Sequence, residues 1–271
     1  MDINRKRVIV IFICIVVIFG GLAVGYRFVQ HERAQNEKIS QLAGNVSYLK
    51  AELNLLRNPA SVEYSDTTFN YLAIGNSITK HALADYWWNE IGMAASSEEK
   101  DYVHLVASAL EEKCGGGGVK FYAYNFYIWE MQSADRAETF ELIDGYLDER
   151  LDLITIQLGE NVDDTSTLKI DFEELIRHIQ EKSPEAQIII IDDFWTDQNK
   201  SKLKKEVANN TGVTFIDLDE IRGKSEFQCG MGTVVYDSDG GKHTVEHSGV
   251  AKHPGDKGME YIANAIISVV Q

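Results

Sequence analysis

Between residues 66 and 271, short apolar runs alternate with segments in which apolar residues recur every three or four positions. Short apolar runs bounded by polar residues indicate buried strands, whereas a period near 3.6 indicates amphipathic helices. The runs predict five strands, at residues 71–74, 119–125, 153–158, 188–191 and 213–218. The periodic segments predict helices at residues 103–110, 137–147, 172–179, 203–207 and 259–270. This alternation predicts an α/β fold, a three-layer α/β/α sandwich around a roughly five-stranded parallel sheet.

Residues 219–252 interrupt this pattern. They are polar, rich in Gly and Asp, and without a clear period. We therefore expect a long loop ahead of the last helix, and long loops in compact domains are often functional.

The N-terminal pattern is different, because the uncharged apolar run from Val8 to Tyr26 is 19 residues long. A helix of that length crosses a hydrocarbon core, and the basic triplet at residues 5–7 would stay on the cytoplasmic side. The pattern predicts a cytoplasmic tail at residues 1–7 and a transmembrane anchor at residues 8–28. A cleaved signal peptide is the alternative, with residues 23–25 as an acceptable cleavage site. Either interpretation places the remaining chain outside the cytoplasm, attached to the cell membrane or secreted.

Residues 29–60 are expected to form a helical stalk before a globular domain at residues 66–271. Apolar residues between Ile39 and Leu56 alternate spacings of three and four, which is typical of a heptad repeat. Two interpretations remain open, a coiled coil that forms a homodimer and a single helix that packs on its own domain. Pro59 ends the pattern, because the residue before a proline avoids the helical region.

Charge and cysteine content limit the partners. The 26 basic and 42 acidic residues give a net charge of −16. Nucleic acids and anionic lipid surfaces need a basic footprint, so neither is expected as a main partner. The chain has three cysteines. Cys114 and Cys229, which both lie beyond the anchor, would be either a disulfide pair or two free thiols.

The chemistry gathers where the predicted strands end. In open parallel sheets, ligands bind beyond the carboxyl ends of the strands. The segments at residues 75–79, 125–130 and 159–161 follow the first three strands, and residues 253–258 precede the last helix. They bring a serine, an amide, a histidine and a tight glycine turn to one edge, which is the inventory of serine acyl transfer.

These segments resemble the sequence blocks of the SGNH (GDSL-type) hydrolases. Gly-Asn-Ser-Ile at residues 75–78 looks like the Gly-Asp-Ser-Leu block, and Gly-Glu-Asn at residues 159–161 resembles the Gly-x-Asn block. His-Pro at residues 253–254 resembles the C-terminal histidine block. The resemblance covers residues 70–271 with the order of the blocks intact. It implies a flavodoxin-like sandwich and a carboxylic ester hydrolase that uses no cofactor and no metal.

The resemblance also implies the role of each residue. Ser77 would be the nucleophile, and His253 would be its base and then the acid for the leaving alcohol. Asn161 would donate its side-chain amide to the oxyanion, together with the backbone N–H of Ser77. The family has a glycine as a further oxyanion donor, and by spacing from Asn125 that position is Glu130, whose backbone N–H would contribute.

One departure concerns the third catalytic group. The family usually has an aspartate three residues before the histidine, and here that residue is Val250. A backbone carbonyl would then orient His253, or another acid would reach it. The candidate acids are Glu246, Asp237, Asp239 and Glu130.

Aromatic side chains near the strand ends suggest a sugar-binding surface, since such rings stack on sugars. Trp129 and Trp195 follow the second and fourth strands and are the candidates for substrate binding. The spacing of His243 and His247 is weak evidence for a metal, and no metal site is expected there.

The N-terminal pattern and the family resemblance together imply a membrane-anchored, extracytoplasmic esterase that removes small acyl groups, above all acetyl, from carbohydrate or cell-surface glycan. Two alternatives remain open. The same acyl-enzyme would serve a glycan O-acyltransferase if a sugar hydroxyl intercepted it. A catalytically silent glycan-binding module is the other alternative, prompted by Val250 and Glu130.

Overall fold

The computed structural model describes residues 62–132, 135–195 and 198–270, together with residues 27, 30–32 and 35, which are helical. The chain divides into two compact units, Met1–Glu52 and Leu53–Gln271. Apart from those few helical positions, the predicted anchor and stalk lie outside the described residues. Among the residues that are described, no helix has the length and apolar character needed to span a membrane.

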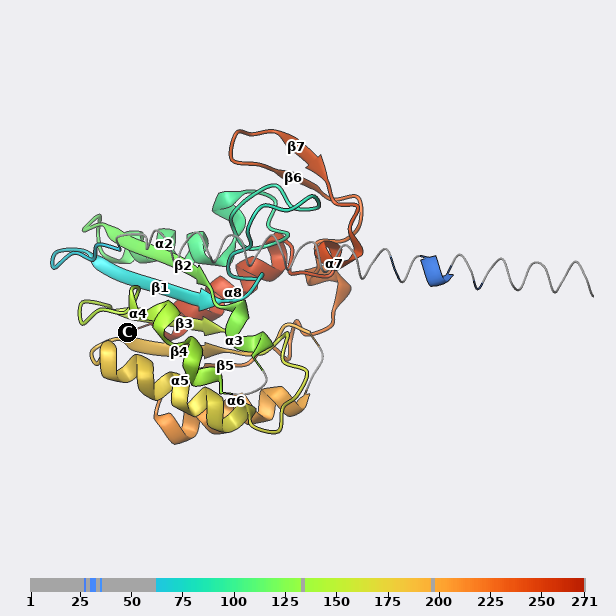
Figure 1. Ribbon diagram of the computed structural model, residues 1–271. Helices are drawn as coiled ribbons and strands as arrows, with labels where there is room; N and C mark the ends of the chain where they lie inside the picture. The colour runs from blue at the N-terminus through green and yellow to red at the C-terminus, as the bar shows by residue number, and fades with distance from the viewer. Residues whose placement is uncertain are drawn as a thin grey trace, which may run out of the picture. The chain divides into compact units, whose positions relative to one another are not determined.

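The second unit carries all of the strands and helices with described bounds (Figure 1). In chain order they are β1 (Phe69–Gly75), η1 (Glu98–Lys100), α2 (Tyr102–Lys113), β2 (Val119–Asn125), α3 (Tyr127–Met131), η2 (Arg136–Thr139), α4 (Glu141–Asp144), β3 (Leu153–Gln157), α5 (Leu168–Lys182), β4 (Gln187–Ile191), α6 (Gln198–Thr211), β5 (Thr214–Ile216), η3 (Ser225–Phe227), β6 (Val234–Tyr236), β7 (Lys242–Thr244), α7 (Ser248–Ala251) and α8 (Asp256–Val269).

The main sheet is parallel and has the strand order β2-β1-β3-β4-β5. The predicted five-stranded parallel sheet is thus confirmed. Register places Gly75 at the end of β1 beside Asn125 of β2 and Gln157 of β3. The three strands therefore end level with one another, and the loops that follow them emerge side by side at one edge of the sheet.

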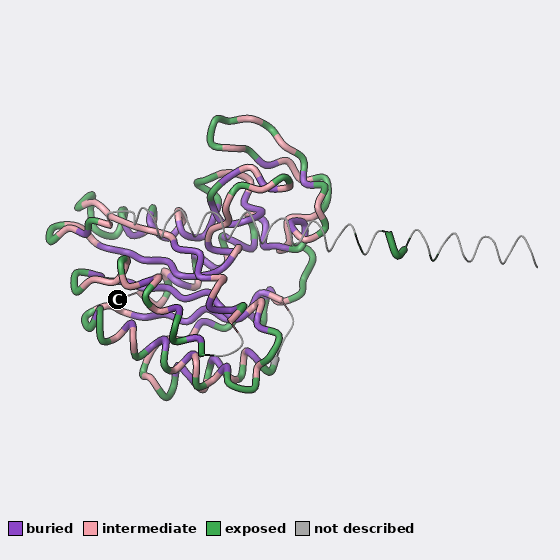
Figure 2. The backbone as a smooth tube through the Cα atoms, in the orientation of Figure 1, coloured by how far each residue is buried: buried purple, intermediate pink, exposed green. Residues whose placement is uncertain are grey.

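Alternating side chains divide the core into two layers. Tyr71 and Ala73 of β1 belong to the cluster that includes buried residues of α2 and α8, whereas Leu72 and Ile74 belong to the cluster that includes buried residues of α5. Successive side chains of a strand point to opposite faces, so a strand with both faces covered is apolar throughout. Figure 2 shows the resulting buried sheet between two partly exposed helical layers. This is the predicted α/β/α sandwich.

The structure corrects the sequence pattern in two places. Residues 137–147, predicted as one helix, form the short helices η2 and α4 instead. Residues 219–252, predicted as a long loop, contain the antiparallel hairpin of β6 and β7 as well as α7.

The hairpin turn depends on local hydrogen bonds to one carboxylate. The Asp237 carboxylate accepts from the backbone N–H of Asp239 at 3.0 Å and of Gly241 at 2.6 Å. Gly240 adopts a φ of 80°, which glycine tolerates without strain. Each strand is three residues long, too short for a period of two to be recognised in the sequence.

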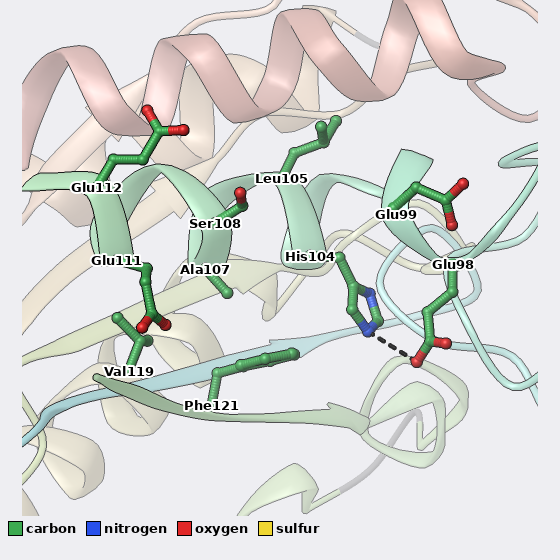
Figure 3. Close-up of a pocket in the computed structure, with 10 residues that line it drawn as sticks. All are labelled: Glu98, Glu99, His104, Leu105, Ala107, Ser108, Glu111, Glu112, Val119 and Phe121. Carbon is green, nitrogen blue, oxygen red and sulfur yellow. Dashed lines mark ion pairs between the residues drawn. The ribbon is translucent and has the colours of Figure 1, made fainter. Parts of the chain in front are cut away.

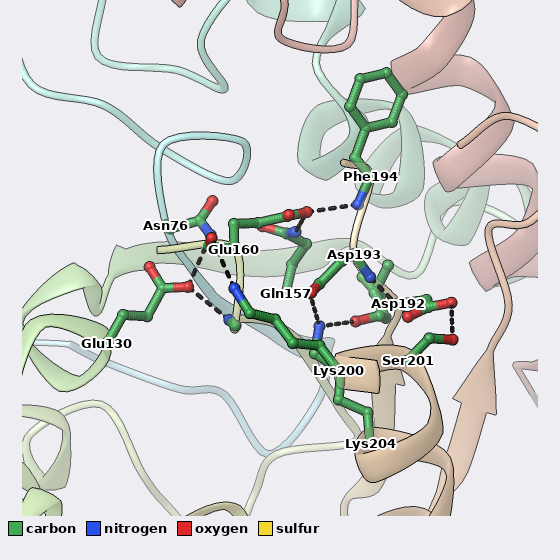
Figure 4. Close-up of polar contacts among 12 residues, drawn as sticks. Asn76, Glu130, Gln157, Glu160, Asp192, Asp193, Phe194, Lys200, Ser201 and Lys204 are labelled. Atoms are coloured by element: carbon green, nitrogen blue, oxygen red, sulfur yellow. Dashed lines mark hydrogen bonds and ion pairs between the residues drawn. The ribbon is translucent and has the colours of Figure 1, made fainter. Parts of the chain in front are cut away.

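A buried ion pair supports the loop that follows β3 (Figure 4). Lys204 of α6 places its Nζ 2.5 Å from Asp193 Oδ1 and 3.0 Å from the Ile191 carbonyl, and both charged side chains are only 1% exposed. A Cβ on Gly159 would lie 2.7 Å from Lys204 Cε, and the φ of Gly159 is 122°. Only glycine at position 159 allows the loop to lie this close to the Lys204 side chain. The Lys204 side chain thus sets the separation between the loop and α6.

We expect Lys204→Ala to lower the free energy of unfolding by about 3–5 kcal/mol, because it leaves the buried Asp193 carboxylate without its cation. Lys205→Ala is the matched control on the exposed side of the same helix and should change it by less than about 0.5 kcal/mol. Urea unfolding followed by circular dichroism measures both variants. Equal stability of the two variants would contradict this account of the ion pair.

Candidate active site

Ser77 lies in the tight turn that follows β1. A Cβ on Gly75 would overlap the side chain of Thr79 and lie 2.9 Å from the Gln157 carbonyl, so the strand leaves the sheet through a glycine. The Asn76 side chain accepts from the Ile78 backbone N–H at 3.0 Å, which closes the turn. Ser77 is thereby held half-buried at the carboxyl edge of the sheet.

His253 reaches the same point from the connection between α7 and α8. Its backbone N–H donates to the Val250 carbonyl at 3.0 Å, and its carbonyl accepts from the Cys229 N–H at 2.9 Å. Its Nε2 lies 2.8 Å from Ser77 Oγ, although the two residues are 176 positions apart in the chain. The structure brings these two predicted residues within hydrogen-bond distance.

A backbone carbonyl orients the imidazole. His253 Nδ1 lies 2.8 Å from the Gly249 carbonyl oxygen. Since a carbonyl only accepts, Nδ1 carries the proton and Nε2 presents its lone pair to the Ser77 hydroxyl. Val250 is buried, and of the candidate acids Asp237 pairs with His243 at 2.8 Å instead. The backbone-carbonyl alternative from the sequence is thus the arrangement that the structure has.

The environment of His253 favours the neutral imidazole. Burial lowers the pKa of His253 to about 4, the hydrogen bond to Gly249 opposes this shift, and the imidazoles of His81 and His247 lower the pKa further. In the part of the chain that the structure describes, no carboxylate contributes to this shift. His253 is therefore ready to accept a proton at neutral pH, but its imidazolium is poorly stabilised.

Two N–H donors lie on the neighbouring turns. Asn161 is half-buried after β3 and directs one N–H of its amide to Glu130 Oε2 at 2.7 Å. A primary amide has two N–H groups, so a second remains. Among the described residues, no acceptor takes the Ser77 backbone N–H. These are the groups that the sequence predicts as oxyanion donors, and that role stays a prediction.

The Glu130 side chain makes contacts at the site that the sequence did not predict. Glu130 is the fourth residue of α3, and its carboxylate receives donors from the loops after β1 and β3 (Figure 4). The spacing from Asn125 therefore identified a residue of the site but did not reveal these side-chain contacts. Donation by the Glu130 backbone N–H to the oxyanion stays a prediction.

The predicted substrate contact of Trp129 is wrong. Its side chain is fully buried, meets the ring of Phe172 edge-on at 5.1 Å, and lies under the Arg136 guanidinium at 5.4 Å. No face of the ring is left for a sugar. The short helix α3 turns Trp129 into the layer between the sheet and α5, a direction that position after a strand does not reveal.

Trp195 does lie at the site. Its ring stands edge-on to the His253 imidazole at 4.9 Å, and its Nε1 donates to the Lys252 carbonyl at 3.2 Å. Sequence reasoning missed Tyr86, which stacks on His247 at 4.6 Å, and the His247 imidazole in turn lowers the pKa of His253. It also missed His81, whose imidazole lowers the pKa of His253. The sequence feature that could have identified His81 is its position four residues after Ser77.

One cluster outside the site has the composition of a metal centre. Asp192, Asp217 and Asp219 are the group of three carboxylates that the described residues bring together. The Arg222 guanidinium binds Asp192 directly and approaches Asp219 to 2.9 Å. The arginine thus supplies the cation that these carboxylates need, and the cluster is an ion-pair network.

A hollow in the fold has a lining that is separate from Ser77 and His253 (Figure 3). It lies between α2 and the edge strand β2, and four of its lining residues are glutamates, at positions 98, 99, 111 and 112. His104 in its wall pairs with Glu98 at 3.1 Å. Neither Ser77 nor His253 lines this hollow.

Cys114 and Cys229, the two cysteines among the described residues, are both free. Cys114 is exposed and Cys229 is half-buried, and the structure contains no disulfide between them. Of the two alternatives left by the sequence, the structure has the free thiols.

Comparison with solved structures gives several similar proteins. Phospholipase A1 from Streptomyces albidoflavus is 14% identical with a TM-score of 0.48, over 74% of this chain and 99% of its own. A GDSL-like lipase from Parabacteroides merdae is 16% identical with a TM-score of 0.44, over 76% and 96%. A family two carbohydrate esterase from Clostridium thermocellum, solved with cellohexaose, is 14% identical with a TM-score of 0.48, over 76% and 65%.

No protein-family model and no curated protein sequence matches the chain. The chain is thus similar, at low sequence identity, to solved structures of GDSL-like lipases and carbohydrate esterases.

Proposed function

We propose that this chain is a serine esterase of the SGNH type. The observation that carries the proposal is the chain of contacts from Ser77 Oγ to His253 Nε2 and from His253 Nδ1 to the Gly249 carbonyl, each at 2.8 Å. A hydroxyl becomes a useful nucleophile when a correctly oriented base lies next to it. This arrangement supplies the nucleophile, the base and the group that orients the base.

The reaction follows from these contacts. His253 accepts the proton of the Ser77 hydroxyl as Oγ attacks the ester carbonyl carbon. The oxygen of the tetrahedral intermediate takes hydrogen bonds from the Asn161 amide and the Ser77 N–H. The imidazolium then gives its proton to the departing alcohol, which leaves an acyl group on Ser77. Water, deprotonated by His253, then attacks this acyl group. The bond from the acyl carbon to Ser77 Oγ breaks, the imidazolium returns its proton to Oγ, and the carboxylic acid leaves.

The Gly249 carbonyl limits the range of substrates. A neutral carbonyl stabilises an imidazolium less than a carboxylate does, and burial destabilises that cation further. A poorly stabilised imidazolium is a weak point in reactions with poor leaving groups. We therefore assign the site to esters, whose alcohols leave readily, and not to amides.

The substrate class rests on the order of the sequence blocks and on charge. We assign a small acyl group, acetyl in the first instance, carried by a neutral carbohydrate or cell-surface glycan. A net charge of −16 disfavours strongly anionic polymers, and Trp195 beside His253 offers an aromatic ring to a sugar. The apolar run at residues 8–26 supports a location on the outer face of the cell membrane.

Hydrolysis of 4-nitrophenyl acetate by the purified full-length chain tests this proposal. Ser77→Ala and His253→Ala should each lower kcat/KM by about 10⁴–10⁶-fold, because the nucleophile and its base act as one unit. Ser108→Ala on the exposed side of α2 and His178→Ala on α5 are matched controls and should retain activity. Activity that survives both site variants would refute the proposal. Acetyl transfer to a sugar with little hydrolysis would assign the same site to an acyltransferase.

The pH dependence should follow the low pKa of His253. The imidazole acts as a base only when it is neutral, and its pKa is lowered to about 4 from its ordinary value of 6.5. We therefore expect kcat/KM for 4-nitrophenyl acetate to stay constant from about pH 8 to about pH 5. Below about pH 4 it should fall tenfold per pH unit. Circular dichroism at each pH confirms that the chain stays folded, and half-maximal activity near pH 6.5 would contradict the burial of His253.

A further inference from the structure

A single buried carboxylate joins three of the segments that form the site. Glu130 of α3 is 2% exposed, and its Oε1 accepts from the Gly159 N–H at 2.5 Å and from Asn76 Nδ2 at 3.1 Å. Its Oε2 accepts from Asn161 Nδ2 at 2.7 Å, and the Asn161 backbone N–H lies 3.4 Å from Oε1. The turn after β1, the helix after β2 and the turn after β3 thus meet at one side chain.

All of these partners are N–H donors. Burial raises the pKa of Glu130, and the hydrogen bonds from Asn161, Gly159 and Asn76 oppose that shift. In the described part of the chain, no lysine or arginine contributes to the balance. The carboxylate is therefore held by neutral donors alone. Burying a charge without a counter-charge costs folding free energy, so packing by itself does not account for a glutamate here.

The contact determines which way the Asn161 amide faces. The two ends of an asparagine amide have the same shape, one accepting and the other donating hydrogen bonds. A carboxylate accepts only, so it holds the NH₂ end of Asn161 on its own side and turns the carbonyl end away. The second N–H of that NH₂ group is then fixed in direction as well. An inverted amide would present its carbonyl oxygen where the proposed reaction requires a donor.

We propose that Glu130 is a positioning residue that fixes Asn161 as an oxyanion donor. The inference rests on the proposed function, since it concerns the same reaction. Glu130 acts through geometry, because a negative charge behind the donor opposes the developing oxyanion. Its carboxylate touches neither substrate nor the reacting atoms.

Glu130→Gln tests the inference with the least change in shape. The Gln side chain places an NH₂ group against donors that need an acceptor, and it allows the Asn161 amide to invert. We expect kcat for 4-nitrophenyl acetate to fall by about 10²-fold with KM changed by less than about twofold, which is typical of a lost oxyanion donor. Glu138→Gln, the same substitution at an exposed residue of η2, is the matched control and should leave both constants unchanged.

A double variant separates positioning from a general structural effect. If Glu130 acts through Asn161, then Glu130→Gln combined with Asn161→Ala should be no slower than Asn161→Ala alone. A merely structural residue would slow the reaction in both backgrounds by the same factor. A full multiplicative loss in the double variant, or a kcat of Glu130→Gln within twofold of Glu138→Gln, would overturn the inference.

Nuclear magnetic resonance of the unaltered chain gives a readout that needs neither activity nor a Glu130 variant. The side-chain amide signal of Asn161 is assigned by its loss in Asn161→Ala. One of its two protons should lie strongly downfield, because it donates to a carboxylate, and the other should not. Two ordinary amide shifts would overturn the inference even if Glu130→Gln failed to fold. An inactive wild type with the downfield proton would refute the proposed function while leaving the Glu130 contact established.

Discussion

The hydrogen bond from His253 Nδ1 to the Gly249 carbonyl is the contact on which the site depends, since it decides the tautomer of the imidazole. With the proton on Nδ1, the lone pair of Nε2 faces Ser77 Oγ. The same bond sets a limit, because a carbonyl carries no net charge to stabilise an imidazolium. A buried, neutral histidine with a low pKa and a serine at hydrogen-bond distance is the consequence.

The fold fixes the loops after β1 and β3, which carry Ser77 and Asn161. Gly75 and Gly159 let the backbone leave β1 and β3 at close quarters, where a Cβ would overlap neighbouring atoms. The ion pair of Lys204 and Asp193 packs against the loop after β3. The Glu130 carboxylate accepts a hydrogen bond from the Gly159 N–H of the same loop. The loops at this edge of the sheet are thus held in place by buried polar contacts. A buried polar group that lacks its hydrogen-bond partner lowers the stability of the fold.

The sequence predicted the strands because strands are local features, and it predicted Ser77 and His253 through their resemblance to two short sequence blocks. An apolar run such as residues 188–191 must be buried whatever surrounds it, and level strand ends follow from parallel pairing. It failed for Trp129, which lies next to Glu130 in the short helix α3. Its position after β2 was correct, but the turn of α3 decided that Trp129 enters the core and that the Glu130 carboxylate meets the turns after β1 and β3.

By itself, the sequence determined the α/β sandwich and the edge of the sheet where chemistry gathers, because periodicity and glycine turns are properties of neighbouring residues. Its resemblance to the SGNH sequence blocks singled out Ser77, Asn161 and His253. It left open what orients His253, since Val250 offers no acid and several carboxylates stood within reach along the chain. Only the tertiary structure decided that the Gly249 carbonyl fills this place, that Asp237 pairs with His243, and that Glu130 meets Asn161. Hydrogen bonds between distant segments depend on the direction of each side chain, which the packing of the whole domain sets.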